Sequence, residues 1–182
     1  MFEKSVEELT ELGAQITTAE IAQQPELWRD TLNIYRENKE AIEAFLAEAR
    51  AMGEGRLSVV FTGAGTSDYV GDTCAPYLRH ADLYDFKPIA TTDIVSAPRD
   101  FLRAEDPTLV VSFARSGNSP ESLAAVAVAK ELVHNVKFLN ITCAPEGKLA
   151  VESADDPNAL TLLIPRANDK GFAMTGSYSC MT

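Results

Sequence analysis

The segment from Val59 to Asp72 decides the fold, and it reads VVFTGAGTSDYVGD. An apolar run leads into Gly-x-Gly, then into small hydroxyl residues, and then into a stretch with helical character. This order predicts a strand, a tight glycine turn and a helix whose N-terminus suits an anion. In the dinucleotide-binding pattern a third glycine stands where this chain has Asp68. The turn could therefore hold a dinucleotide, another phosphate or no ligand.

Outward from this segment, short apolar runs alternate with helical stretches or loops, which predicts βαβ units. The expected strands are LSVVFT (57–62), FKPIAT (86–91), TLVVSFA (108–114), VKFLNITC (136–143) and ALTLLIP (159–165). The expected helices or loops between them cover 67–80, 121–134 and 145–153. We therefore predict a three-layer α/β/α sandwich with a five-stranded, parallel, doubly wound sheet. Its expected order is the flavodoxin-like 2-1-3-4-5.

Residues 1–52 have a helical pattern instead of alternating strands and helices, and we predict a helical arm there, followed by an α/β domain over 53–182. Thr18 is expected to cap a short helix, and a second helix is expected after Pro25. Apolar residues then recur at three- and four-residue spacing until Gly53 and Gly55 end the helix. The arm has too few large apolar residues for a domain of its own, so it is expected to pack on the core or on a second subunit.

Two loops are candidates for ligand binding, and both follow predicted strands. The first runs from Gly63 to Ser67, and the second runs from Ala114 to Ser119, with Ser119 and Pro120 giving a strong helix-start signal. In the expected strand order, the first and third strands are neighbours at the switch point, where open α/β sheets bind ligands. The hydroxyls of Ser67, Ser116 and Ser119 would converge there with backbone N–H groups. This combination suits a phosphate monoester.

Two other interpretations of these loops stay open, and a third is excluded. Serine, threonine and glycine are common in any strand-to-helix turn, so either loop alone is as well explained by turn chemistry. A dinucleotide is the weaker alternative, because the acidic residues available for a ribose, Asp82 and Asp85, precede the second strand instead of ending it. A P-loop is excluded, because the chain has no Gly-Lys-Ser/Thr in the first loop.

Several other polar residues are explained by structural roles that need no ligand. His80 and His134 are expected at helix ends, where a partial positive charge is favourable. Glu121 is expected to complement the dipole of the helix that it opens, and Asp93 to cap a turn. Arg115 is the cation of the second loop, and it could contact a phosphate or form an ion pair. Residues 168–170 and the small residues of 171–177 could form a third wall of the crevice.

Composition limits the partners and the location. The net charge of −11 disfavours nucleic acid, because binding to nucleic acid depends on a basic face. The three cysteines are far apart and odd in number, which indicates neither a disulfide framework nor a zinc cluster. No apolar run reaches the roughly 20 residues of a membrane span, and the N-terminus has no signal peptide pattern. We expect a cytoplasmic protein without a membrane segment.

The two loops also resemble a known family. GAGTS at 63–67 and SFARSGNSPES at 112–122 resemble the sugar isomerase (SIS) domain of phosphosugar-binding proteins. The segments TTAEIAQQPELW, TTDIVSAP and DKGFAMTGSYSCM are similar to the AgaS-type tagatose-6-phosphate ketose/aldose isomerases, or galactosamine-6-phosphate deaminase/isomerases. The resemblance covers essentially the whole chain.

The resemblance implies a sugar phosphate as ligand, a homodimer, and no metal or cofactor. The site residues that it and the loops imply are Gly65, Thr66, Ser67, Arg115, Ser116, Gly117, Asn118, Ser119 and Thr175. The small-residue wall of the sugar site would fall on 172–175. Where synthase relatives have Ser-Gln-Ser-Gly-Glu-Thr in the second loop, this chain has Ala-Arg-Ser-Gly-Asn-Ser, so Arg115 is a plausible replacement contact.

The family has two such domains in tandem, and its catalytic glutamate and histidine lie in the second. We therefore expect the catalytic base beyond Thr182, and a chain that binds better than it catalyses. The expected reaction of the whole protein is proton transfer between C1 and C2, in isomerisation or in deamination of an amino sugar. The alternative is a non-catalytic phosphosugar sensor that regulates another protein.

Overall fold

The computed structural model describes residues 3–53, 56–80 and 84–182. The predicted Gly55 helix end and the ribose candidate Asp82 lie outside these residues. Five parallel strands form one sheet in the order β2-β1-β3-β4-β5, which confirms the predicted fold class and topology. The strands are β1 (Leu57–Gly63), β2 (Tyr84–Pro88), β3 (Thr108–Ala114), β4 (Val136–Thr142) and β5 (Ala159–Leu163).

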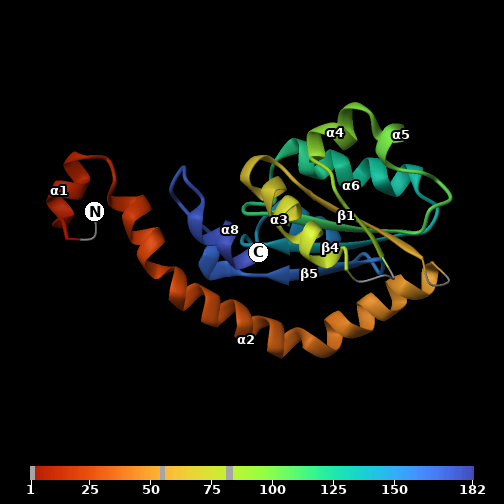
Figure 1. Ribbon diagram of the computed structural model, residues 1–182, viewed down its shortest axis with the longest axis horizontal. Helices are drawn as coiled ribbons and strands as arrows, with labels where there is room; N and C mark the ends of the chain where they lie inside the picture. Colours follow the sequence, from red (N-terminus) through yellow and green to blue (C-terminus); the bar gives the residue numbers. More distant parts are fainter. Residues whose placement is uncertain (1–2, 54–55, 81–83) are drawn as a thin grey trace.

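Helices cover both faces of the sheet (Figure 1). The helical segments are α1 (Val6–Glu11), α2 (Gln15–Met52), η1 (Gly65–Ser67), α3 (Asp68–Leu78), α4 (Thr91–Ser96), α5 (Pro98–Phe101), α6 (Pro120–Leu132), α7 (Lys148–Ser153), η2 (Pro165–Ala167) and α8 (Thr175–Met181). Side chains of α2, α3 and α8 pack on one face, and side chains of α4 and α6 pack on the other. Strand β3 is buried along its whole length, because successive side chains serve the two cores in alternation.

The second strand differs from the prediction at both ends. It begins at Tyr84 and ends at Pro88, so Ile89 to Thr91 do not continue it. Thr91 instead begins α4, and its hydroxyl donates to the carbonyl of Gly63 at 3.0 Å. The β-branched residues of this stretch favoured a strand. A helical turn instead allows Ile94 to be buried in the second core and Thr91 to contact Gly63.

The arm is also different, because α2 is one helix of 38 residues that passes through Pro25 and Thr18. A proline in a helix interior costs about 3 kcal/mol. Contacts on both sides of Pro25 oppose a break: Glu20 is buried against the segment after η2, and Leu27 is 1% exposed in the core. The predicted cap at Thr18 and the helix break at Pro25 are therefore wrong. The helix curves around the sheet, as long helices do around a core (Figure 1).

At its C-terminal half, α2 is joined to the sheet by a partly buried ion pair. Lys137 in β4 lies 2.9 Å from the carboxylate of Glu48 and 5.0 Å from the ring centroid of Phe45. Nearer the centre, an apolar cavity of about 330 Å³ remains between the sheet, α2, α3 and α8. No helix within the described residues is long and apolar enough to cross a membrane.

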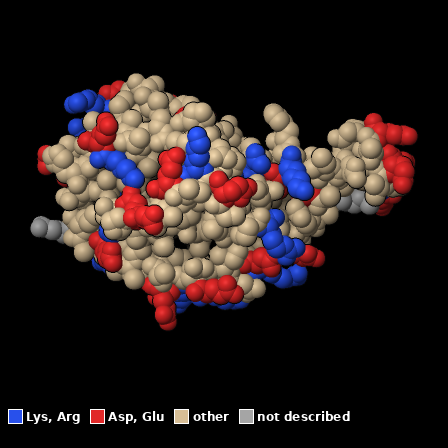
Figure 2. Space-filling model, turned by 180° about the vertical axis from the view of Figure 1, so that it is seen from behind, with Lys and Arg blue, Asp and Glu red and all other residues tan. Residues whose placement is uncertain are grey.

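Charged side chains are distributed over the surface without a basic stripe on the face that Figure 2 draws, where acidic and basic groups alternate. The projecting end of the arm is acidic, with Glu7, Glu8 and Glu11 in or at α1. Helix α1 was not predicted. Its start is a capping box, in which Ser5 and Glu8 satisfy each other's backbone N–H groups.

Candidate functional site

The first loop joins β1 to α3 through a tight turn that glycine makes possible. A Cβ at Gly63 would lie 2.5 Å from the backbone carbonyl of Ser67, so the loop folds directly back onto the strand end. Gly65 has φ +58°, and a Cβ there would meet nothing within 4 Å. Gly71 lets α3 approach β1, because its Cβ would be 2.9 Å from the Cβ of Phe61. The close helix–strand packing that a third glycine gives in dinucleotide folds is thus provided one turn later, which explains why Asp68 is tolerated.

The second loop joins β3 to α6 and is supported from behind by the turn before α7. Gly117 has φ +63°, and its carbonyl accepts from the N–H of Leu149 at 2.9 Å. The side-chain oxygen of Asn118 accepts from the N–H of Lys148 at 3.0 Å. Gly147 packs so closely that a Cβ there would lie 2.2 Å from the carbonyl oxygen of Ser116. The loop is therefore held in a single shape by contacts outside itself.

Both helices that follow these loops begin at a serine that does not cap them. Ser67 and Ser119 occupy the N-cap positions of α3 and α6, but neither side chain accepts a capping hydrogen bond. Ser119 instead donates to the hydroxyl of Ser122 at 2.7 Å. Pro120 is at the first helical position, as predicted. The start of α6 can therefore offer backbone N–H groups to an anion, whereas at α3 the N–H groups of Ser67 and Asp68 donate to the carbonyls of Ala64 and Gly65 in the preceding turn.

The two loops meet at one crevice. Strands β1 and β3 are neighbours, with Gly63 beside Phe113, so their carboxyl ends bring the loops together. The crevice has a volume of about 310 Å³. Its lining consists of Ala64, Gly65, Ser67, Phe113, Ala114, Arg115, Ser116, Gly117, Ser119, Glu121, Ser122 and Met174. Hydroxyl and backbone groups from two chain segments about 50 residues apart thus face one small volume.

Of the predicted site residues, six line the crevice: Gly65, Ser67, Arg115, Ser116, Gly117 and Ser119. Three do not: Thr66, Asn118 and Thr175. The Asn118 side chain is occupied with Lys148. The hydroxyl of Thr175, at the start of α8, is buried and has no hydrogen-bond partner among the described residues. Phe172, in the predicted small-residue wall, is fully exposed, whereas Met174 reaches the crevice.

Arg115 is oriented by the segment that follows η2. Its Nη1 donates to the backbone carbonyl of Asp169 at 2.7 Å, and its Nε lies 3.0 Å from the sulfur of Met174. A longer contact of 3.5 Å joins Nη1 to the side-chain oxygen of Asn168. The guanidinium therefore neither points freely to solvent nor forms an ion pair with a described residue. Its Nη2 makes no hydrogen bond to the described part of the chain.

Sequence reasoning did not single out Phe113 or Ser122 among the lining residues, and it explained Glu121 without reference to the crevice. Ser122 comes three residues after Ser119 and so shares its helical face, which is a signal that could have been used. Met174 lies within the wall predicted over 172–175, and it borders the crevice. Glu121 is in the first turn of α6, as predicted, and also borders the crevice.

Burial and charge shift several pKa values near the site. The pKa of Asp68 is raised by partial burial and by the neighbouring carboxylates of Asp72 and Asp93. The pKa of Cys143, directly after β4, is raised to about 12 by burial and the nearby Asp169. Cys143 is 0% exposed, which excludes it as a nucleophile in the folded chain.

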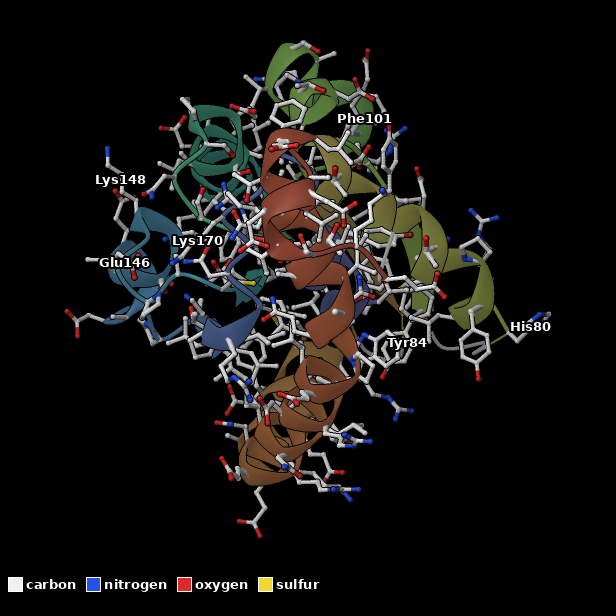
Figure 3. The ribbon with its side chains drawn as sticks, turned by 90° about the vertical axis from the view of Figure 1, so that its left-hand side faces the viewer. His80, Tyr84, Phe101, Glu146, Lys148 and Lys170 are labelled. Atoms are coloured by element: carbon white, nitrogen blue, oxygen red, sulfur yellow. The ribbon has the colours of Figure 1, made fainter. Side chains whose placement is uncertain are left out.

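The remaining candidates lie elsewhere. Figure 3 shows His80 at the rim of the molecule, pointing outward, and Glu146 and Lys148 at the opposite edge. His134 follows α6 and lies 3.4 Å from Glu105 at the surface. Within the described ranges, no group of three or more histidine, cysteine or acidic side chains is placed to hold a metal ion.

A comparison with family models agrees with this architecture, since residues 55–182 match the SIS domain model. The chain belongs to the SIS domain family. Within it, the chain is 44% identical over 181 residues to the D-galactosamine-6-phosphate deaminase AgaS of a Shewanella species. It is 48% identical over 167 residues to an AgaS protein of Streptomyces coelicolor. These matches confirm the AgaS-type resemblance of the two loops.

Solved structures lead to the same relatives. The tagatose-6-phosphate ketose/aldose isomerase of Escherichia coli superposes with a TM-score of 0.84 at 40% identity, over 90% of this chain and 44% of that one. The two AgaS alignments cover 97% and 91% of this chain but 46% and 43% of the relatives. The chain thus spans a little under half the length of the relatives it matches.

Proposed function

We propose that this chain is the phosphosugar-binding half of a ketose/aldose sugar-phosphate isomerase or amino-sugar-6-phosphate deaminase. The observation that supports it best is the crevice, where Ser67, Ser116 and Ser119 face one volume together with backbone from two glycine turns. A phosphate monoester needs many donors in a small space, and glycine turns let backbone N–H groups approach it. The names of the AgaS and isomerase relatives support the same substrate class.

In this proposal the phosphate lies between the two loops, and the sugar extends out of the crevice toward Met174. Arg115 adds a cation next to the phosphate, where a charge-assisted contact is stronger than a neutral one. Carbons C1 and C2 of a hexose 6-phosphate lie at the end of the molecule remote from the phosphate. Glu121, which starts α6 beside Ser119, is therefore in the wrong place to move a proton between them.

The base for proton transfer between C1 and C2 is accordingly assigned to a part of the protein other than residues 1–182. Chemistry of this kind requires a general base within hydrogen-bond reach of the transferred proton. We also propose a cytoplasmic homodimer with no nucleic-acid partner and no cofactor. The net charge of −11 supports the absence of a nucleic-acid partner, and exposed apolar side chains of α2 such as Trp28 and Leu32 support the dimer. Light scattering after size exclusion tests the dimer.

Calorimetry with Ser116→Ala and Ser119→Ala tests the phosphate site. Both substitutions should weaken binding of a hexose 6-phosphate by about tenfold each, because each removes a hydrogen bond to a charged group. Binding of the unphosphorylated sugar should change by less than about twofold. The matched control is Ser153→Ala, since Ser153 bonds within α7 and β5. Equal weakening of both ligands would contradict the phosphate assignment.

A turnover assay separates the enzyme from the sensor. This chain should bind tagatose 6-phosphate or galactosamine 6-phosphate without converting either, whereas the Shewanella relative serves as the active control. Turnover by this chain would overturn the assignment of the base to another part of the protein. The sensor alternative predicts no turnover even from the whole protein to which this chain belongs.

A further inference from the structure

The irregular segment from Asn168 to Met174 connects the arm to the crevice, although it has little apolar contact of its own. Phe172 at its tip is fully exposed. The segment nevertheless carries the two groups that orient Arg115, the carbonyl of Asp169 and the sulfur of Met174. Its conformation therefore decides where the guanidinium points.

Two buried carboxylates hold this segment. Glu20 of α2 is 6% exposed, and its Oε1 accepts from the N–H groups of Lys170 at 2.7 Å and Gly171 at 2.9 Å. Asp169 is 3% exposed, and its Oδ2 accepts from the N–H of Ser177 at 2.7 Å and from its hydroxyl at 2.9 Å. Figure 3 shows Lys170 beside the arm helix.

Glycines make room for both carboxylates. A Cβ at Gly171 would lie 2.6 Å from Oε2 of Glu20, and a Cβ at Gly176 would lie 2.7 Å from Oδ1 of Asp169. The arm thus holds the segment through the side chain of Glu20, which any residue larger than glycine at position 171 would displace. The same part of the arm lies on the side of the molecule where the strands end (Figure 1).

We propose that Glu20 is a positioning residue of the phosphosugar site and acts through Arg115. Glu20 fixes the N–H groups of Lys170 and Gly171, which fixes the adjacent Asp169 carbonyl and thereby the guanidinium at the crevice. The arm is then part of the binding unit rather than only a support for the sheet. The inference rests on the proposed function, because Arg115 matters only if an anion binds between the loops.

A double-mutant cycle with Glu20→Ala and Arg115→Ala tests this coupling, with binding of hexose 6-phosphate measured by calorimetry. Arg115→Ala should weaken binding by about tenfold or more, because a charge-assisted contact is lost. Glu20→Ala alone should weaken it by about fivefold, and the double variant should bind no worse than Arg115→Ala. Additive losses, or no loss in Glu20→Ala, would overturn the proposal.

Three further variants guard against a general loss of folding. Glu20→Gln keeps an acceptor oxygen for both N–H groups, so it should bind within about twofold of the unmodified chain. Gly171→Ala pushes on the carboxylate from the other side, so it should reproduce Glu20→Ala and likewise have no effect in the Arg115→Ala background. Glu37→Ala, on the exposed part of α2, is the matched control and should change nothing. A Glu20→Gln variant as weak as Glu20→Ala would contradict the hydrogen-bond role.

Hydrogen exchange separates failure of this inference from failure of the proposed function, because it needs no ligand. Glu20→Ala should expose the amides of Lys170 and Gly171 to exchange at least about tenfold faster, while amides of β3 stay protected. Unchanged exchange of these two amides would refute the claim that Glu20 holds the segment. Fast exchange in Glu20→Ala, together with no binding of hexose 6-phosphate by the unmodified chain, would instead refute the proposed function and leave the contact intact.

Discussion

Replacing Gly63 and Gly65 separately with alanine distinguishes two reasons for glycine in the same turn. Gly65 has room for a methyl group but a positive φ of +58°. Its alanine variant should lose about 1–2 kcal/mol of unfolding free energy, which is the cost of a left-handed conformation for one ordinary residue. For a chain of this size, that loss lowers the unfolding temperature by roughly 2–8 °C.

Gly63 has no such dihedral cost, but its methyl group would lie 2.5 Å from the carbonyl carbon and oxygen of Ser67 and 2.7 Å from the N of Asp68. These are backbone atoms, so the turn must open. Overpacking typically costs about 1–3 kcal/mol, and a clash with three backbone atoms belongs at the upper end of that range. Urea denaturation of both variants measures the difference, and calorimetry with a hexose 6-phosphate measures binding. Gly65→Ala should retain stability better than Gly63→Ala. The reverse order of stability would refute this account of the turn.

Three further predictions concern stability and reactivity. Lys137→Met should change the unfolding free energy by less than about 1 kcal/mol, because an apolar chain of similar length can fill the buried Lys137 position while exposed Glu48 turns to solvent. Lys137→Ala should cost about 2–3 kcal/mol by leaving a cavity, and urea denaturation compares the two variants. The pKa of Asp68 is raised in the folded chain above its ordinary value of 3.8. Its contribution to the free energy of unfolding is therefore fully present below pH 3.8 and is lost as pH rises through the folded pKa. Asp68→Asn should therefore raise the unfolding temperature at pH 7 and not at pH 3, and an equal shift at both pH values would contradict the burial argument. Cys143 has a pKa of about 12 and no exposure, so at pH 8 it should react with a thiol reagent only as fast as the chain unfolds. Half-buried Cys74 should react earlier, and mass spectrometry of labelled peptides measures both rates.

The sheet could be predicted from the sequence because its signals are local. The run from Thr108 to Ala114 is apolar enough to be buried on both faces, and Ser119 with Pro120 marks the next helix start. Once the strand order is predicted, β1 and β3 are neighbours at the switch point, and the loops that follow them must lie together. That is why six of the nine expected site residues line one crevice.

The sequence predictions that the structure contradicts share a physical cause. In each case the observed conformation depends on contacts between residues that are distant in the sequence. Pro25 normally interrupts a helix, but Glu20 and Leu27 on either side of it are held by the segment after η2 and by the core. The second strand was expected to include Thr91, but Thr91 begins α4 and its hydroxyl donates to the carbonyl of Gly63, 28 residues earlier. The role of Asn118 as a ligand contact stays a prediction; its side-chain oxygen accepts from the N–H of Lys148.

The division into an arm over 1–52 and a domain over 53–182 stays a prediction. Helix α2 ends at Met52 with Gly53 as its C-cap, and β1 begins at Leu57. Glu20 nevertheless joins the arm to the segment after η2, and Glu48 joins it to Lys137 of β4. A fragment that begins after the arm is therefore expected to be less stable than the whole chain and to bind sugar phosphate less well.

The most direct measurement is a map of backbone amide shifts by NMR as the chain is titrated with a hexose 6-phosphate and, separately, with the free hexose. The account predicts shifts centred on Gly65, Ser67, Ser116 and Gly117 that require the phosphate. A competing anion site would be the basin of mixed charge lined by Arg56, Lys87 and Arg103, at the other end of the strands. Phosphate-dependent shifts in that basin, with the two loops unchanged, would contradict the central claim.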